Sequence, residues 1–355
     1  MSERSSSSSS GGVRGPVGAV EDVARLVLEA EVAVLPLRGS SDAVGVLGRW
    51  LGGADVGRAE DVLLASYHLR DKDILELVPA IARWAGVESV APHVRRLLGM
   101  APVKELRPVL VPVLAARLRG EPDSDGALRR ACVGLLEHLG LEDQTRCLTD
   151  PDFHGSRTPP PEAPGEPGDD GPGPADEAPG GGEPADGKAG PVDEGAIAQA
   201  VRRSAHFMRR AVVAAAPLAG NPDVVALIEG WLGTWGGEHY LDSLRAVYML
   251  PDDDLLALVP VIVRWVDVDR VAPHPRRLLC MLPISRLRPV LVPAVFSQLR
   301  EDPEVDDLSW WSYADLLDDI GLKNEVRRIA DLALTHEDRL VRAMGKEIVE
   351  DLLQD

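Results

Sequence analysis

A long internal repeat constrains this chain more than any other feature. Shifted by 181 positions, Ala19–Asp150 aligns with Ala200–Asp331 without a gap, and about half of the positions in Trp50–Arg119 are identical in the second copy. Self-similarity over such a length is typical of a duplicated folding unit. Each copy, of roughly 130 residues, is long enough to bury a core of its own. The sequence therefore predicts two tandem homologous domains.

The periodicity within each copy is helical. Leu, Val and Ala dominate the apolar residues, which make up 45% of the chain, and the alternation typical of strands is scarce. The predicted fold class is all-α, with short connections that imply antiparallel neighbours. In the second copy we expect helices over Ile197–Ala216, Val224–Leu232, Leu241–Leu250, Leu255–Val266, Pro273–Met281, Pro289–Arg300, Trp310–Ile320, Lys323–Leu334 and Arg339–Leu353.

Changes in composition set the predicted boundaries. Residues 1–16 are rich in Ser and Gly, and we expect a disordered tail. The first helical domain covers 17–151. Residues 152–195 hold eleven acidic and two basic residues among many Pro and Gly, so they have too few apolar side chains to offset the entropy of ordering. The second domain, 196–355, follows this predicted disordered linker and carries an extra C-terminal helix.

Short stretches of both copies resemble HEAT-type helical repeats. The segment "LRPVLVPAVFSQLREDPEVD" has the Leu-rich face and internal Pro of one HEAT helix, and "LRPVLVPVLAARLRGEP" is its relative in the first copy. The C-terminal "LTHEDRLVRAMGKEIVEDLL" resembles the second HEAT helix, with Asp338, Val341 and Arg342 in the expected spacing. The resemblance implies a HEAT-like, α-solenoid architecture whose function is binding, usually of protein, along a helical surface.

The motif "VAPHxRRLL" is the sharpest candidate site. It places six candidate anion- or partner-binding residues in the two copies: His93, Arg95, Arg96, His274, Arg276 and Arg277. If Pro92 and Pro273 open helices, exposed backbone N–H groups, the helix dipole and two guanidinium groups would together attract an anion. Phosphate, a carboxylate and an acidic segment of a partner are the candidate anions.

A structural reading of the same motif competes with the binding reading. One arginine of each pair can instead form an ion pair with Asp71 and Asp73, or with Asp252 and Asp254. Short acidic runs at helix starts are usually caps, and no pattern of metal ligands accompanies them, so we expect no metal site.

A second candidate surface belongs to the second copy alone. Trp310, Trp311 and Tyr313 lie in "LSWWSYADLL", where the first copy has "ALRRACVGLL". Exposed aromatic side chains are frequent anchors of protein interfaces. We therefore regard these three residues as a candidate partner surface.

Charge and motifs exclude several classes of protein. A net charge of −19 opposes broad binding of nucleic acid. Three cysteines without a C-x-x-C motif oppose a disulfide framework or a thiolate zinc site, and no cofactor motif is present. The N-terminus lacks the apolar core of a signal peptide, and no apolar stretch is long enough to span a membrane, so we expect a cytoplasmic protein. With 33 Arg against five Lys, the composition is typical of a GC-rich bacterial genome.

Three functional hypotheses remain open. The leading one is a non-enzymatic scaffold or adaptor, whose partner is another protein or whose two units associate with each other, because a duplicated and tethered unit can form a pseudo-dimer. The alternative is a module that binds a phosphorylated small molecule or nucleic acid through the two His-x-Arg-Arg motifs. The third is an all-α enzyme, which would need a deep pocket of convergent polar groups.

Overall fold

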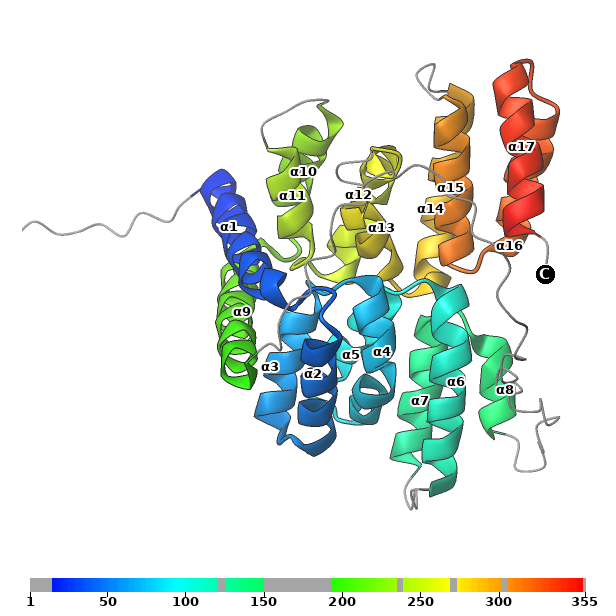
Figure 1. The fold of residues 1–355 in the computed structure, drawn as a ribbon. Helices are drawn as coiled ribbons and strands as arrows, with labels where there is room; N and C mark the ends of the chain where they lie inside the picture. The colour runs from blue at the N-terminus through cyan, green and yellow to red at the C-terminus, as the bar shows by residue number, and fades with distance from the viewer. Residues whose placement is uncertain are drawn as a thin grey trace, which may run out of the picture.

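The computed structural model describes residues 15–120, 126–149, 193–234, 239–268, 273–301 and 306–353. Every regular element within these ranges is an α-helix or a 3-10 helix, which confirms the all-α prediction (Figure 1). The predicted tail at 1–16 and the predicted linker at 152–195 lie almost wholly outside the described residues. We call residues 15–149 the first half and residues 193–353 the second half.

The two halves contain a matching series of helices. The first half has α1 (Pro16–Val34), η1 (Leu35–Leu37), α2 (Ser41–Gly53), α3 (Val56–Ser66), α4 (Asp71–Ile81), η2 (Ala82–Trp84), α5 (Ala91–Gly99), α6 (Val103–Gly120), α7 (Ala127–His138) and α8 (Glu142–Thr149). The second half has α9 (Glu194–Ala215), η3 (Ala216–Leu218), α10 (Pro222–Gly233), α11 (Tyr240–Val247), α12 (Asp252–Ile262), η4 (Val263–Trp265), α13 (Pro273–Cys280), α14 (Ile284–Glu301), α15 (Asp307–Asp319), α16 (Lys323–Leu334) and α17 (Arg339–Leu352).

Helices within a half form two stacked layers. In the first half, α2 packs on α4 and α4 on α6, while α3 packs on α5 and α5 on α7. The second half shows the same order, with α10 on α12, α12 on α14, and α11 on α13. Leu77 of α4 and Leu110 of α6 are among the fully buried side chains that fill the first half. Stacked helices of this kind leave extended outer surfaces.

The first helix of each half packs against the other half. α1 lies along α9 and α11, whereas α9 lies along α1 and α3 (Figure 1). The contact faces are apolar, and Val23 and Val27 of α1 and Ala205 and Met208 of α9 are buried. A sequence repeat predicts which helices form, but the copy against which each helix packs depends on the tertiary structure.

One predicted helix start is wrong. We expected Pro289 to open a helix, but α14 begins at Ile284 and contains both Pro289 and Pro293. A proline inside a helix removes one backbone hydrogen bond. Leu287 and Leu291 flank Pro289 and are fully buried, so the helical path that keeps both in the core outweighs this loss. α17 and most other helices of the second half begin and end within a few residues of their predicted bounds.

No single helix in the described part of the chain is long and apolar enough to cross a membrane. The pair Glu194–Leu218 and Pro222–Gly233, bent by 112°, reaches that length and composition only when its two members are taken together.

Candidate anion-binding site between the two halves

The two His-x-Arg-Arg motifs begin α5 and α13. Pro92 lies in the first turn of α5, and Pro273 is the first residue of α13. Proline fits there because the first N–H groups of a helix have no intrahelical acceptor. Leu97 and Leu278 are fully buried, which fixes the rotation of each helix about its axis. The polar side chains of both motifs therefore lie near the boundary between the halves.

Arg96 and Arg277 cross that boundary in a reciprocal way. Arg96 Nη2 donates to Asp252 Oδ1 at 2.6 Å, and Arg277 Nη2 donates to Asp71 Oδ1 at 2.5 Å. Each guanidinium group also donates to backbone carbonyl groups just before the same aspartate. The sequence analysis gave ion pairs with nearby aspartates as the alternative to anion binding. Arg96 and Arg277 form such ion pairs, and these pairs join one half to the other. Their first role is structural.

The two histidines of the motifs face tyrosines. Tyr67 Oη lies 3.4 Å from His93 Nδ1, and Tyr248 Oη lies 3.4 Å from His274 Nδ1. Burial lowers the pKa of both histidines and raises the pKa of both tyrosines. All four side chains are therefore neutral near pH 7, and the histidines add no charge to the site.

Arg276 is neutralised within its own half. Its Nη1 pairs with Asp315 and lies 3.4 Å from Asp319 Oδ2, and its Nη2 donates to Ser312 O at 3.3 Å. Lys104 of the first half approaches the same acidic cluster, 3.4 Å from Asp319 Oδ1. Burial and the neighbouring Asp315 carboxylate raise the pKa of Asp319 to about 6. The Arg276 charge is fully matched by carboxylates.

Arg95 occupies the aligned position in the first half without such partners. At the 181-residue offset, Gly134 stands where the second half has Asp315, and His138 stands where it has Asp319. Within the described ranges, no carboxylate lies at ion-pairing distance from Arg95, and its side chain is exposed. The sequence analysis did not single out Gly134 or His138, although the differences between the two copies at these positions carried the signal.

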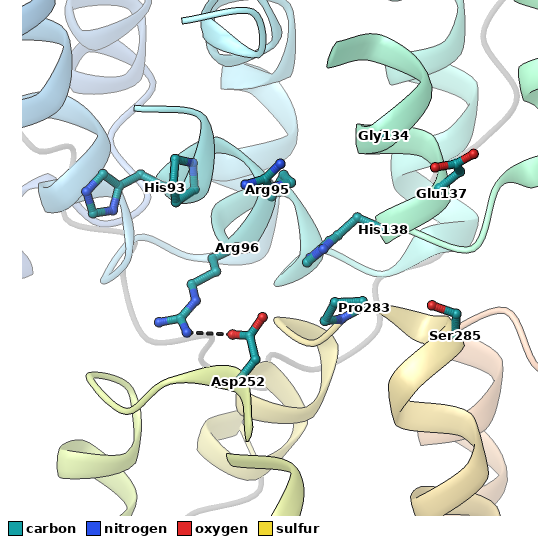
Figure 2. Close-up of a pocket in the computed structure, with 10 residues that line it drawn as sticks. His93, Arg95, Arg96, Gly134, Glu137, His138, Asp252, Pro283 and Ser285 are labelled. Carbon is teal, nitrogen blue, oxygen red and sulfur yellow. Dashed lines mark hydrogen bonds and ion pairs between the residues drawn. The ribbon is translucent and has the colours of Figure 1, made fainter. Parts of the chain in front are cut away.

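A cavity of about 520 Å³ lies beside Arg95, between the two halves. The first half lines it with Pro92, His93, Arg95, Arg96, Gly134, Glu137 and His138, and the second half with Asp252, Pro283 and Ser285. Figure 2 shows Arg95, His138 and Glu137 around the same opening, while Arg96 turns towards Asp252. The sequence motif thus contributes four residues to the cavity, and tertiary packing adds the others.

His138 is neutral in this cavity. Its Nε2 lies 3.1 Å from Met281 O, so this nitrogen carries the proton and donates it to the carbonyl. Burial, together with the nearby Arg95 and Arg96 charges, lowers the pKa of His138 to about 4, against the opposite influence of Asp252 and of the hydrogen bond to Met281. The cavity therefore contains one guanidinium group, that of Arg95, which pairs with no carboxylate of the described residues, and Glu137 also lines it.

The candidate aromatic surface lies largely inside the protein. Trp310 is 4% exposed and Tyr313 is 2% exposed, because α16 and α17 cover α15. The Trp310 ring packs edge-on against the ring of His336, at 5.5 Å between centroids. Only Trp311 is half-buried, so these three residues do not form an exposed aromatic patch.

Other reactive groups offer no chemical site. Cys280 is a free cysteine, and burial raises the pKa of its thiol, which stays protonated and unreactive. Cys132 is buried. In the part of the chain that the structure describes, no three His, Cys, Asp or Glu side chains cluster as metal ligands would.

Comparisons with known proteins name no relative. No family model and no curated protein matches the chain. A crystal structure described as that of an engineered protein, from the Northeast Structural Genomics Consortium, aligns over 95% of each chain with 13% sequence identity and a TM-score of 0.21. A likeness this weak supports no statement about fold or function.

Proposed function

We propose that this chain is a non-enzymatic interaction protein in which two HEAT-like halves, closed on each other, bind an anionic group in the cavity between them. The observation that carries the proposal is Arg95, a guanidinium group without a carboxylate partner in the described residues, beside a cavity of about 520 Å³. Sites for small ligands commonly have volumes of about 300–1,000 Å³. The planar fork of an arginine suits anions that present two oxygen atoms.

The contacts between the halves support a pseudo-dimer that arose by duplication. Arg96 pairs with Asp252 just as Arg277 pairs with Asp71, and α1 and α9 are exchanged between the halves. Such reciprocal contacts are typical of twofold-symmetric dimers. In this proposal the segment 152–195 is a tether that keeps the two halves at a high effective concentration. The protein would act in the cytoplasm, in line with its composition.

The anionic group can belong to a small molecule or to an acidic side chain of a protein partner. Nucleic acid is disfavoured, because the net charge is −19 and Arg95 is the one motif arginine in the described cavity whose charge is free. A partner protein would make the chain an adaptor, as the HEAT resemblance implies.

Calorimetric titration of the full-length protein tests the proposal. We expect saturable binding of at least one of three probes, inorganic phosphate, succinate and a glutamate-rich peptide blocked at both ends, and a loss of about tenfold or more in affinity for Arg95→Ala. The matched control is Arg202→Ala, which removes an exposed arginine of α9 that does not line the cavity, and its affinity should be unchanged. Absence of saturable binding to the wild type, or equal weakening by both substitutions, would contradict the proposal.

The adaptor role has a parallel test. A protein recovered from the native host in stoichiometric amount with the wild type should be lost with Arg95→Ala and retained with Arg202→Ala. Recovery with all three proteins would place the partner elsewhere on the surface.

A further inference from the structure

The cavity beside Arg95 has a counterpart beside Arg276. The counterpart measures about 370 Å³ and is also lined by residues of both halves. Six lining positions of the two cavities correspond at the 181-residue offset: Pro92 and Pro273, Arg95 and Arg276, Arg96 and Arg277, His138 and Asp319, Asp252 and Asp71, Pro283 and Pro102. The two cavities are therefore two versions of one design.

In the counterpart, carboxylates of the protein itself form ion pairs with the arginine. Asp315 and Asp319 both approach Arg276 Nη1, and Lys104 supplies a second cation to the same cluster. This arrangement shows that a guanidinium group at this position can bind a carboxylate. Asp318 and Lys323 belong to the same network, so three carboxylates and three cations balance there without any ligand.

The Arg95 cavity lacks both carboxylates and the second cation. Gly134 and His138 replace the acidic residues, and Ser285 stands at the position aligned with Lys104. Glu137, which aligns with Asp318, also lines the cavity but forms no ion pair with Arg95, and Arg96 is already paired with Asp252. A ligand carboxylate would give Arg95 the kind of partner that Asp315 gives Arg276.

We infer that this cavity binds the carboxylate of a ligand on Arg95, once per chain, and that Gly134 and His138 hold the site open. The inference rests on the proposed function and specifies the class of the ligand. A carboxylate presents two coplanar oxygen atoms to the guanidinium fork and carries one charge. A phosphoryl group near pH 7 carries about 1.5–2 negative charges, and its excess charge would lie near Asp252 and the neutral imidazole of His138.

Titration of the full-length protein with three probes tests the inference. The probes are succinate, a glutamate-rich peptide blocked at both ends, and inorganic phosphate. We expect one carboxylate probe to bind with a stoichiometry of one per chain and at least about tenfold more tightly than phosphate. Binding of succinate alone indicates a small-molecule ligand, binding of the peptide alone indicates an acidic segment of a partner, and either outcome supports the carboxylate.

A sharper test exchanges the aligned residues of the two cavities by substitution. Gly134→Asp combined with His138→Asp should close the Arg95 cavity and abolish binding, while Arg202→Ala leaves it unchanged. Asp315→Gly combined with Asp319→His should open the second cavity and raise the stoichiometry to two. Because Asp319 also pairs with Lys104, circular dichroism must show that this variant is folded. If it is not folded, the single substitution Gly134→Asp, which should weaken binding by about tenfold or more, decides the question.

Three results would overturn the inference. Preference for phosphate over both carboxylate probes would refute the carboxylate assignment and leave the proposed anion-binding function standing. Carboxylate binding that survives Gly134→Asp would place the ligand elsewhere. Failure of every anion to bind the wild type would remove both the inference and the proposed function.

Discussion

Aligned residues meet different surroundings in the two halves. Arg95 and Arg276 occupy the same position of the same motif, yet only Arg276 is neutralised by carboxylates. The motif itself predicts arginines at a helix start near an acidic cluster, and it does so for both copies. Which arginine stays free depends on residues about 40 positions further on, which α7 and α15 bring next to α5 and α13.

The protonation of His68 should make the stability of the protein depend on pH. It is buried, its Nε2 lies 3.3 Å from Met208 Sδ, and burial lowers its pKa from 6.5 to about 3. Between these values the unfolded chain binds a proton that the folded protein does not bind. His68 by itself should therefore lower the free energy of unfolding by about 1.4 kcal/mol per pH unit as the pH drops from 6.5 towards 3. His68→Met, which introduces the residue of the aligned position Met249, should make this decline shallower.

Urea unfolding of both proteins at several pH values measures the two slopes. Asp319, whose pKa is raised to about 6, contributes with the opposite sign, since its folded form gains a proton first as the pH falls. This contribution is common to both proteins and cancels in the comparison. Equal slopes would show that His68 is protonated as easily in the folded protein as in the unfolded chain.

Helices α5 and α13 approach each other closely where the two halves meet. A Cβ atom added at Gly99, the last residue of α5, would lie 2.5 Å from the backbone oxygen of Cys280, the last residue of α13. Gly99 and Cys280 are aligned in the repeat, so the missing side chain of Gly99 leaves space for the backbone of its aligned residue, Cys280. The sequence shows that position 99 is Gly and position 280 is Cys. The close approach of α5 and α13, which explains the difference, is visible only in the packed structure.

Gly99→Ala should therefore destabilise the protein. Overpacking against backbone atoms costs about 1–3 kcal/mol. The matched control is Gly230→Ala in α10, where an added Cβ meets nothing within 4 Å and the gain in helix propensity is worth up to about 1 kcal/mol. Urea unfolding should show a lower free energy of unfolding for Gly99→Ala and an equal or higher one for Gly230→Ala, both relative to the wild type. Equal stabilities would mean that α5 and α13 lie further apart than in the structure.

In the described residues the two halves pack against each other, although the sequence suggested two tethered units. α1 completes the packing of the second half and α9 that of the first, so neither half has its full set of contacts alone. The reciprocal pairs of Arg96 and Arg277 add polar contacts across the same boundary. Stability is therefore expected to be shared across the boundary.

A core substitution in one half should lower the stability of both. Leu110 of α6 is fully buried in the first half, and Leu110→Ala should cost about 2–5 kcal/mol. Hydrogen exchange should show the same loss of protection in α5 of the first half and in α13 of the second, with a single unfolding transition in urea. Two separate transitions, of which only one shifts, would show that the halves unfold independently.

The sequence by itself determined the helical class, most helix bounds in the second half and the position of the His-x-Arg-Arg motifs at helix starts. These features depend on periodicity, on proline and on local charge, which act over a few neighbouring residues. Tertiary structure alone decided that α1 and α9 exchange, that Trp310 and Tyr313 are buried, and that Arg95 faces a cavity with His138. Those outcomes depend on contacts between distant segments. Two copies with similar patterns of apolar residues present similar faces to either partner, so only the packed molecule distinguishes them.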